Sequence, residues 1–192
     1  MAESELLEKL RKEISACVKC RELAETRTQT VFGDGTIGAE VLFVGEAPGA
    51  DEDRQGVPFV GKAGQLMDSA MRHAGIPRRM VFIANVLKCR PPENRDPLPD
   101  EIDNCRVFLA AQITLLKPKI ICTLGRFGLQ QLLKGDYKIS EVHGKPIRSK
   151  DNTIYFPMYH PAAALHNGAL RESILEDFKR LAALLKREGI LK

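Results

Sequence analysis

The chain has 192 residues, of which 44% are hydrophobic, and this is enough apolar material for one packed core, so we expect a single domain over residues 1–192. Lysine and arginine number 29 against 25 for aspartate and glutamate, an excess that permits a polyanionic partner without requiring one. No apolar run approaches the roughly 18 residues that a membrane-spanning helix needs, which excludes a helical membrane protein.

The first 15 residues, MAESELLEKLRKEIS, predict a charged amphipathic helix. A secretory signal would contain a continuous apolar stretch, which this segment lacks. We therefore expect a cytoplasmic protein.

Four short runs of continuous apolar residues predict strands. The runs are VLFVG (41–45), VFIANVL (81–87), IICTLG (120–125) and TIYFPMY (153–159). Because they are continuous rather than alternating, we expect these strands to be buried on both faces, as in a parallel sheet.

Helical patterns separate these strands. The segment 64–74 has apolar residues at helical spacing and stops at Gly75, and a second helix is predicted from Pro99, since acidic residues fill its first turns. A shorter helix at 126–133 and an amphipathic helix at 170–188 follow. This alternation predicts an α/β fold, a three-layer α/β/α sandwich around a central four-stranded, mostly parallel sheet.

Two segments rich in turn residues fit neither pattern. They are TQTVFGDGTIG (28–38) and GDYKISEVHGKPIRSKDN (135–152), and they predict hairpins or loops.

Polar residues follow three of the predicted strands. Glu46 lies in the turn after the first strand, Asn85 at the end of the second, and His160 after the fourth. Ligands of open parallel sheets bind at the carboxyl ends of the strands, so these side chains are expected to share one crevice. Each alone is more often a turn or loop residue, and their joint placement favours a site.

Five cysteines are spaced unevenly. Cys17 and Cys20 are close, whereas Cys89, Cys105 and Cys122 stand apart. In a cytoplasmic protein they are not expected to form disulfides, and Cys122, within a predicted strand, is expected to be a buried free thiol. The other four could hold zinc or a [4Fe-4S] cluster, and their spacing favours the cluster only slightly.

Three motifs and these four cysteines carry a resemblance. The motifs are GEAPGADEDRQGVPFVGKAGQLMD (45–68), FIANVLKCRPPENRDP (82–97) and YHPAAAL (159–165). Over residues 17–171 the chain resembles family 4 of the uracil-DNA glycosylases, the thermostable iron-sulfur family. The resemblance implies a hydrolase without a Mg requirement that flips deoxyuridine out of DNA and cleaves its N-glycosidic bond in base excision repair.

The resemblance also implies a [4Fe-4S] cluster on Cys17, Cys20, Cys89 and Cys105, which staples the N-terminal helix to the core. Whether the cluster is structural or redox-active stays open. The expected partner is uracil-containing DNA, single- or double-stranded, bound by a monomer.

A flipped uracil needs a partner for each of its edges and faces. Phe59 is the only aromatic residue near the first turn that can stack on the base, with core packing as its alternative role. Asn85 can accept from uracil N3–H and donate to O4. Family 1 glycosylases exclude thymine with a tyrosine where this chain has Gly49, so Glu52 is the candidate for that task here.

Cleavage places negative charge on uracil O2. His160, as a neutral donor, and the backbone N–H groups of Glu46 and Ala47 are expected to stabilise it. The water-activating aspartate of family 1 falls at Ala47, so either Glu46 polarises the water or the reaction needs little help from a base.

DNA binding requires cationic side chains and a residue to fill the space of the flipped base. Leu165, or Ala164, is the candidate wedge. The candidate phosphate ligands are Lys62, Arg90, Arg95 and Arg171.

Two other classes of protein stay open. A uracil-DNA binder or cross-linker of a related branch would carry a basic insertion that is absent between Cys89 and Cys105. An iron-sulfur electron-transfer protein would explain the cysteines but not the convergence of Glu46, Asn85 and His160.

Overall fold

The computed structural model describes residues 3–192 and contains a six-stranded sheet in the order β1-β3-β2-β4-β6-β5. Its four central strands pair in parallel, which confirms the predicted α/β fold. These strands are β2 (Val41–Gly45), β3 (Val81–Asn85), β4 (Ile120–Leu124) and β6 (Ile154–Met158).

The sheet has two more strands than the four predicted. β1 (Asp34–Gly35) pairs antiparallel with β3, and β5 (Ile147–Arg148) pairs antiparallel with β6. Both lie in the turn-rich segments and contain two residues each, too few for a recognisable apolar pattern. Short edge strands of this kind protect a sheet from pairing with another chain.

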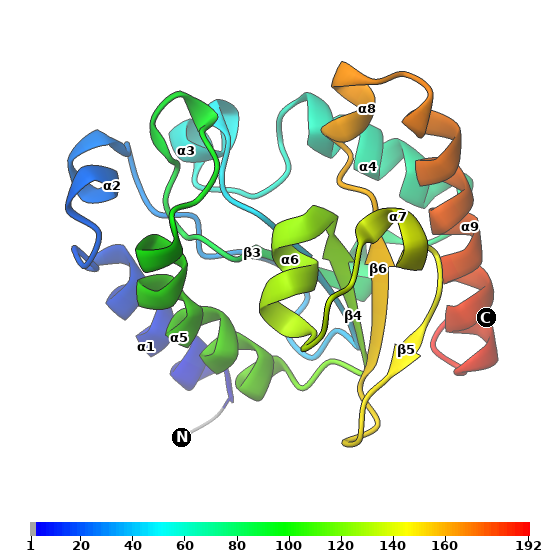
Figure 1. The fold of residues 1–192 in the computed structure, drawn as a ribbon. Helices are drawn as coiled ribbons and strands as arrows, with labels where there is room; N and C mark the ends of the chain where they lie inside the picture. The colour runs from blue at the N-terminus through cyan, green and yellow to red at the C-terminus, as the bar shows by residue number, and fades with distance from the viewer. Residues whose placement is uncertain (1–2) are drawn as a thin grey trace.

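Helices cover both faces of the sheet (Figure 1). α1 (Glu3–Ser15) and α5 (Pro99–Leu116) pack on one face, and α4 (Lys62–His73) and α9 (Leu170–Arg187) on the other. The strands divide their side chains between the two layers. In β2, Val41 and Phe43 belong to the α4/α9 core, while Leu42 and Val44 belong to the α1/α5 core.

The remaining helical elements are short. They are α2 (Arg21–Thr26), α3 (Ala50–Gln55), α6 (Gly125–Leu132), α7 (Ile139–Val142), α8 (Ala163–His166) and the 3-10 turns η1 (Arg78–Met80) and η2 (Pro92–Asn94). Of the predicted amphipathic segment at residues 1–15, the first two residues lie outside the described part. Within residues 3–192, every helix is either too short or too polar to span a bilayer.

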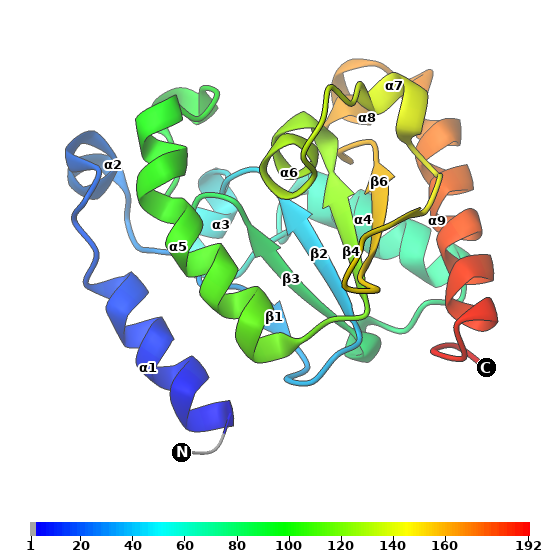
Figure 2. The same ribbon diagram turned by 60° about the horizontal axis from the view of Figure 1, so that its bottom comes forward.

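The carboxyl ends of the central strands point to one edge of the sheet (Figure 2). β3 ends at Asn85, earlier than the predicted segment 81–87. Beyond its end, the N–H groups of Val86 and Leu87 donate to the carbonyl oxygens of Gly45 and Glu46 at 3.0 and 2.9 Å. These bonds fix the positions of the loops after β2 and β3 relative to each other at this edge.

Candidate active site

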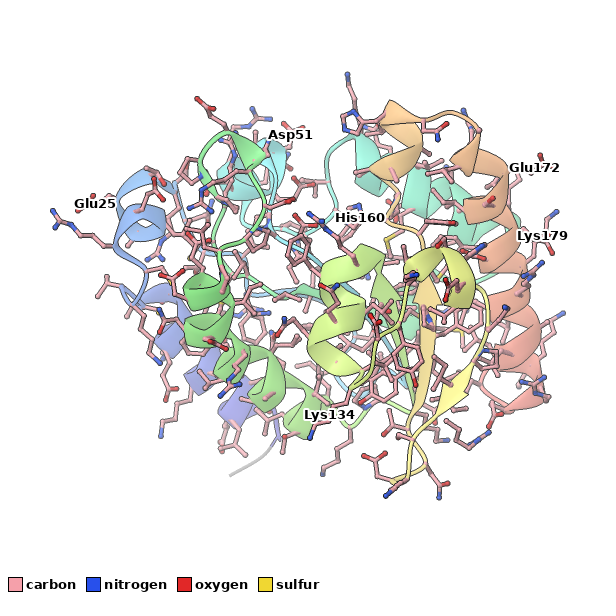
Figure 3. All side chains as sticks on the ribbon, in the orientation of Figure 1. Glu25, Asp51, Lys134, His160, Glu172 and Lys179 are labelled. Atoms are coloured by element: carbon pink, nitrogen blue, oxygen red, sulfur yellow. The ribbon has the colours of Figure 1, made fainter. Side chains whose placement is uncertain are left out.

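A pocket of about 640 Å³ opens at the carboxyl ends of the strands, a volume in the range of small-ligand sites. We call it the strand-end pocket. It brings together all six residues predicted to contact a base, which are Glu46, Ala47, Glu52, Phe59, Asn85 and His160. In Figure 3, His160 lies in the interior between the regions of α3 and α8, while Asp51 lies at the rim on α3.

Asn85 presents a polar atom with no partner. Its side chain is 2% exposed, and Oδ1 accepts no hydrogen bond from any residue in the described part of the chain. Buried polar atoms are nearly always paired, so an open acceptor in a pocket indicates a site for a ligand donor. Gly45 makes room for this amide, since a Cβ there would lie 2.4 Å from Oδ1.

Phe59 stands in the pocket with a left-handed backbone, φ 55°, which is unusual for an aromatic residue. The following N–H groups, of Val60 and Gly61, donate to Glu52 Oε1 at 3.0 and 2.9 Å. Gly64 lets α4 approach this loop, because a Cβ there would lie 1.7 Å from the Phe59 carbonyl oxygen. The Phe59 ring is thereby held 5.5 Å from the His160 ring, centroid to centroid.

Glu52 therefore supports the Phe59 loop with one carboxylate oxygen. The other, Oε2, faces Gly49, where an added Cβ would lie only 2.7 Å away. The side chain thus occupies the space beside Gly49 where the sequence predicts a barrier against thymine. That role stays a prediction, and the support of the Phe59 loop is a feature that the sequence did not reveal.

His160 is neutral in this environment, because burial lowers its pKa to about 4. The backbone N–H of Ala162 donates to Nδ1 at 3.1 Å, so Nδ1 is an acceptor. In a neutral imidazole the proton then resides on Nε2. His160 can therefore offer Nε2–H as a hydrogen-bond donor.

In Glu46 the pKa shifts upward. Desolvation and, to a smaller extent, the Asp96 carboxylate raise it, the Arg126 guanidinium lowers it, and the net result is a pKa of about 7. A carboxylate with a pKa near neutrality can accept a proton from water at physiological pH. Neither Asp96 nor Arg126 was predicted as a site residue, since single charged residues in loops carry no pattern.

The predicted DNA ligands occupy different positions. Lys62 and Leu165 line the strand-end pocket, and Leu165 is 49% exposed. Arg171 lies in the first turn of α9, and Arg90 donates from Nε to Asn94 Oδ1 at 2.8 Å.

Arg95 also lines the pocket, but its guanidinium is engaged elsewhere. It forms ion pairs with Glu101 at 2.6 Å and with Glu22 at 2.7 Å. These pairs anchor the loop before α5 to α2. A role for Arg95 in binding phosphate, as predicted from the sequence, would compete with both carboxylates.

Cys17, Cys20, Cys89 and Cys105 line a second cavity with a mostly apolar surface, here called the cysteine cavity. All are free thiols, and residues 3–192 contain no set of three His, Cys, Asp or Glu side chains arranged to hold a single metal ion. The residues fit a larger group, because the four cysteines surround one cavity and its walls supply donors to sulfur. Cys122 is a buried thiol in β4, as predicted.

Those donors are two side chains and one backbone N–H group. Arg27 donates from Nη1 to Cys89 Sγ at 2.9 Å, the Lys88 N–H to Cys105 Sγ at 3.3 Å, and Asn104 Nδ2 to Cys20 Sγ at 3.7 Å.

Lys88 connects the cavity with the pocket. Its side chain is 1% exposed, and Nζ donates to the Asn85 carbonyl oxygen at 2.8 Å and to Gln112 Oε1 at 2.6 Å. A buried lysine was not foreseen, because lysine is normally a surface residue.

Comparison with known proteins agrees with this geometry. Residues 32–182 match the family model described as Uracil DNA glycosylase superfamily. The type-4 uracil-DNA glycosylase of Sulfurisphaera tokodaii is 46% identical to this chain over 93% of the chain and 84% of that protein. That of Archaeoglobus fulgidus is 43% identical over 94% of each, and that of Thermotoga maritima 40% over 96% and 97%. The chain therefore belongs to the uracil-DNA glycosylase superfamily and, within it, to the type-4 family.

Proposed function

We propose that the protein removes uracil from DNA by hydrolysing its N-glycosidic bond, leaving an abasic site for base excision repair. The observation that carries this proposal is the buried amide oxygen of Asn85 in the strand-end pocket, which has no hydrogen-bond partner among residues 3–192. Uracil offers an N3–H donor beside the O4 acceptor, and one side-chain amide can satisfy both. The names of the similar type-4 glycosylases agree with this activity.

The base enters the pocket flipped out of the helix, because its edges are inaccessible within a duplex. Phe59 stacks on its face, and Asn85 reads N3–H and O4. Glu52 stands beside Gly49, where the methyl group of thymine would enter. Leu165 fills the space that the base leaves, and Lys62, Arg90 and Arg171 contact phosphates.

Hydrolysis breaks the bond between C1′ of the sugar and N1 of uracil. The electron pair goes to uracil, so negative charge accumulates on O2 and positive charge on the sugar. His160 donates a hydrogen bond from Nε2 to O2 and keeps its proton, and the N–H groups of Glu46 and Ala47 are further donors. Water attacks C1′, and the Glu46 carboxylate takes the proton that this water loses.

Cys17, Cys20, Cys89 and Cys105 would hold a [4Fe-4S] cluster in the cysteine cavity. The cluster would stabilise the folded state by linking the segment after α1 to the segment after β3 and to α5. The hydrolysis itself uses no electron transfer. We propose that residues 1–192 act as one domain and as a monomer.

The test is release of free uracil from an oligonucleotide with one uracil, in EDTA. Wild type is expected to release it, and Asn85→Ala to release it about a hundredfold more slowly, because the base loses two hydrogen bonds. Asn152→Gly is the control, since Asn152 is an exposed turn residue before β6, at the other end of the sheet. A wild type that binds this DNA and frees no base would refute the proposal in favour of a binder or cross-linker.

A further inference from the structure

An ion pair connects the segments that follow β3 and β4, on either side of Glu46. In the sheet, β2 lies between β3 and β4, and Glu46 directly follows β2. Asp96 belongs to the loop after β3, and Arg126 lies in α6, directly after β4. Arg126 Nη2 contacts Asp96 Oδ2, so the pair joins the loop after β3 to the start of α6, on either side of the loop that carries Glu46.

This pair also contributes the strongest charge effects on Glu46. Asp96 disfavours its ionisation and Arg126 favours it, on top of the desolvation of a partly buried carboxyl group. Other ionisable groups line the same pocket. They are Asp51, Glu52, Lys62, Arg95, His160 and His166.

Most of these other groups have partners of their own. Asp51 pairs with Arg54, Glu52 accepts backbone N–H groups, and Arg95 pairs with Glu101. His160 is neutral over the pH range of the proposed reaction, because burial lowers its pKa to about 4. The charge state of Glu46 therefore depends mainly on its burial and on the balance between Asp96 and Arg126.

We propose that Asp96 and Arg126 are positioning residues for hydrolysis, and that their ion pair sets the charge state in which Glu46 meets the attacking water. This inference rests on the proposed function, in which Glu46 takes the proton of that water. Neither residue has to touch the substrate for this role. The positive charge of Arg126 balances the negative charge of Asp96. Without Arg126, the negative charge near Glu46 would have no counter-charge from this pair.

The two single variants of this pair are expected to change the ionisation of Glu46 in opposite directions. Removing Arg126 leaves a negative charge beside Glu46, so ionisation of Glu46 becomes harder. Removing the charge of Asp96 leaves the positive charge of Arg126, so ionisation becomes easier. A contact that merely stabilised the loops would change both variants in the same direction.

The experiment measures single-turnover uracil release between pH 5.5 and 8.5 for wild type, Arg126→Met and Asp96→Asn. The midpoint of the acid limb is expected to rise by about half a pH unit in Arg126→Met and to fall by about as much in Asp96→Asn, the size of a solvent-screened charge effect. Arg148→Met is the matched control, because Arg148 forms an exposed ion pair of the same kind with Glu188, between β5 and the end of α9.

A second measurement does not depend on activity. Titration of the Glu46 carboxyl carbon by NMR without DNA, assigned with Glu46→Gln, is expected to show the same opposite shifts. Shifts in one direction, or none, would overturn the inference even if wild type releases uracil. Absence of uracil release by wild type would refute the proposed function instead, while opposite NMR shifts would still support the role of the pair in setting the charge of Glu46.

Discussion

The strand-end pocket and the cysteine cavity lie at the two ends of residues 85–89, yet they differ in how far their polar groups are hydrogen-bonded. In the pocket, the buried Oδ1 of Asn85 has no partner within the described part of the chain. Around the cavity, three of the four cysteine sulfurs accept hydrogen bonds from the chain itself. The pocket therefore has an acceptor that is available to a ligand. In the cavity, the donors of the lining residues bond to the cysteine sulfurs.

Lys88 is where the two regions meet. It donates through its side chain to the carbonyl of Asn85 and through its backbone N–H to Cys105. The segment that we propose to read the base is thereby hydrogen-bonded, through Lys88, to the segment that contains the cysteines. The comparison indicates that one region is built for recognition and the other for support, and variants in each should separate the two roles.

The largest effect is expected from His160→Ala. Loss of a preorganised donor to uracil O2 should slow single-turnover uracil release by about a hundredfold to a thousandfold, roughly 3–4 kcal/mol of transition-state stabilisation, with little change in melting temperature. His73→Ala is the control, because His73 is exposed on α4 and its Nδ1 bonds to the Ser69 carbonyl oxygen in its own helix. An equal loss in both variants would contradict the assignment of the pocket.

A change in the supporting region should have the reverse signature. Cys105→Ala is expected to lower the iron content and, with it, the free energy of unfolding by several kcal/mol, because a cofactor bound only to the folded state stabilises that state. The measurements are iron per chain and denaturant unfolding. Cys122→Ala, in β4 and outside the cavity, should keep its iron, and iron bound equally by all variants would refute the cysteine site.

Gly64→Ala tests how the pocket is supported from within. The added Cβ would stand 1.7 Å from the Phe59 carbonyl oxygen, so α4 or the Phe59 loop must move. We expect a loss of about 1–3 kcal/mol in unfolding free energy and a raised KM for uracil-containing DNA. Gly168→Ala meets nothing within 4 Å and should behave as wild type in both measurements.

The smallest effect concerns Glu46 and pH. Its pKa in the folded protein, about 7, exceeds its ordinary value of 4.5, so the folded state binds more protons between these pH values and loses stability as pH rises through them. Glu46→Gln cannot ionise. Its melting temperature should therefore exceed that of wild type by a few degrees at pH 8 and by less at pH 5. A difference independent of pH would contradict the raised pKa.

Much of the fold could be predicted from the sequence. The strand at 41–45 agrees with β2 in both bounds, and the helices expected at Pro99 and at residue 170 begin there. Continuous apolar runs between amphipathic helices leave few arrangements other than a parallel sheet with helices on both faces. The two-residue strands β1 and β5 could not be predicted, since pairing with a neighbour and not a local pattern defines them.

The candidate site divides in the same way. The sequence by itself determined which residues stand at the strand ends, because Glu46 and His160 follow apolar runs directly and Asn85 follows the apolar residues 81–84. Only the tertiary structure decided the chemical state of these residues. The tautomer of His160 depends on the N–H of Ala162, and the raised pKa of Glu46 on burial and on Asp96. Such states depend on the direction of hydrogen bonds and on desolvation, and these arise only when segments distant in sequence pack together.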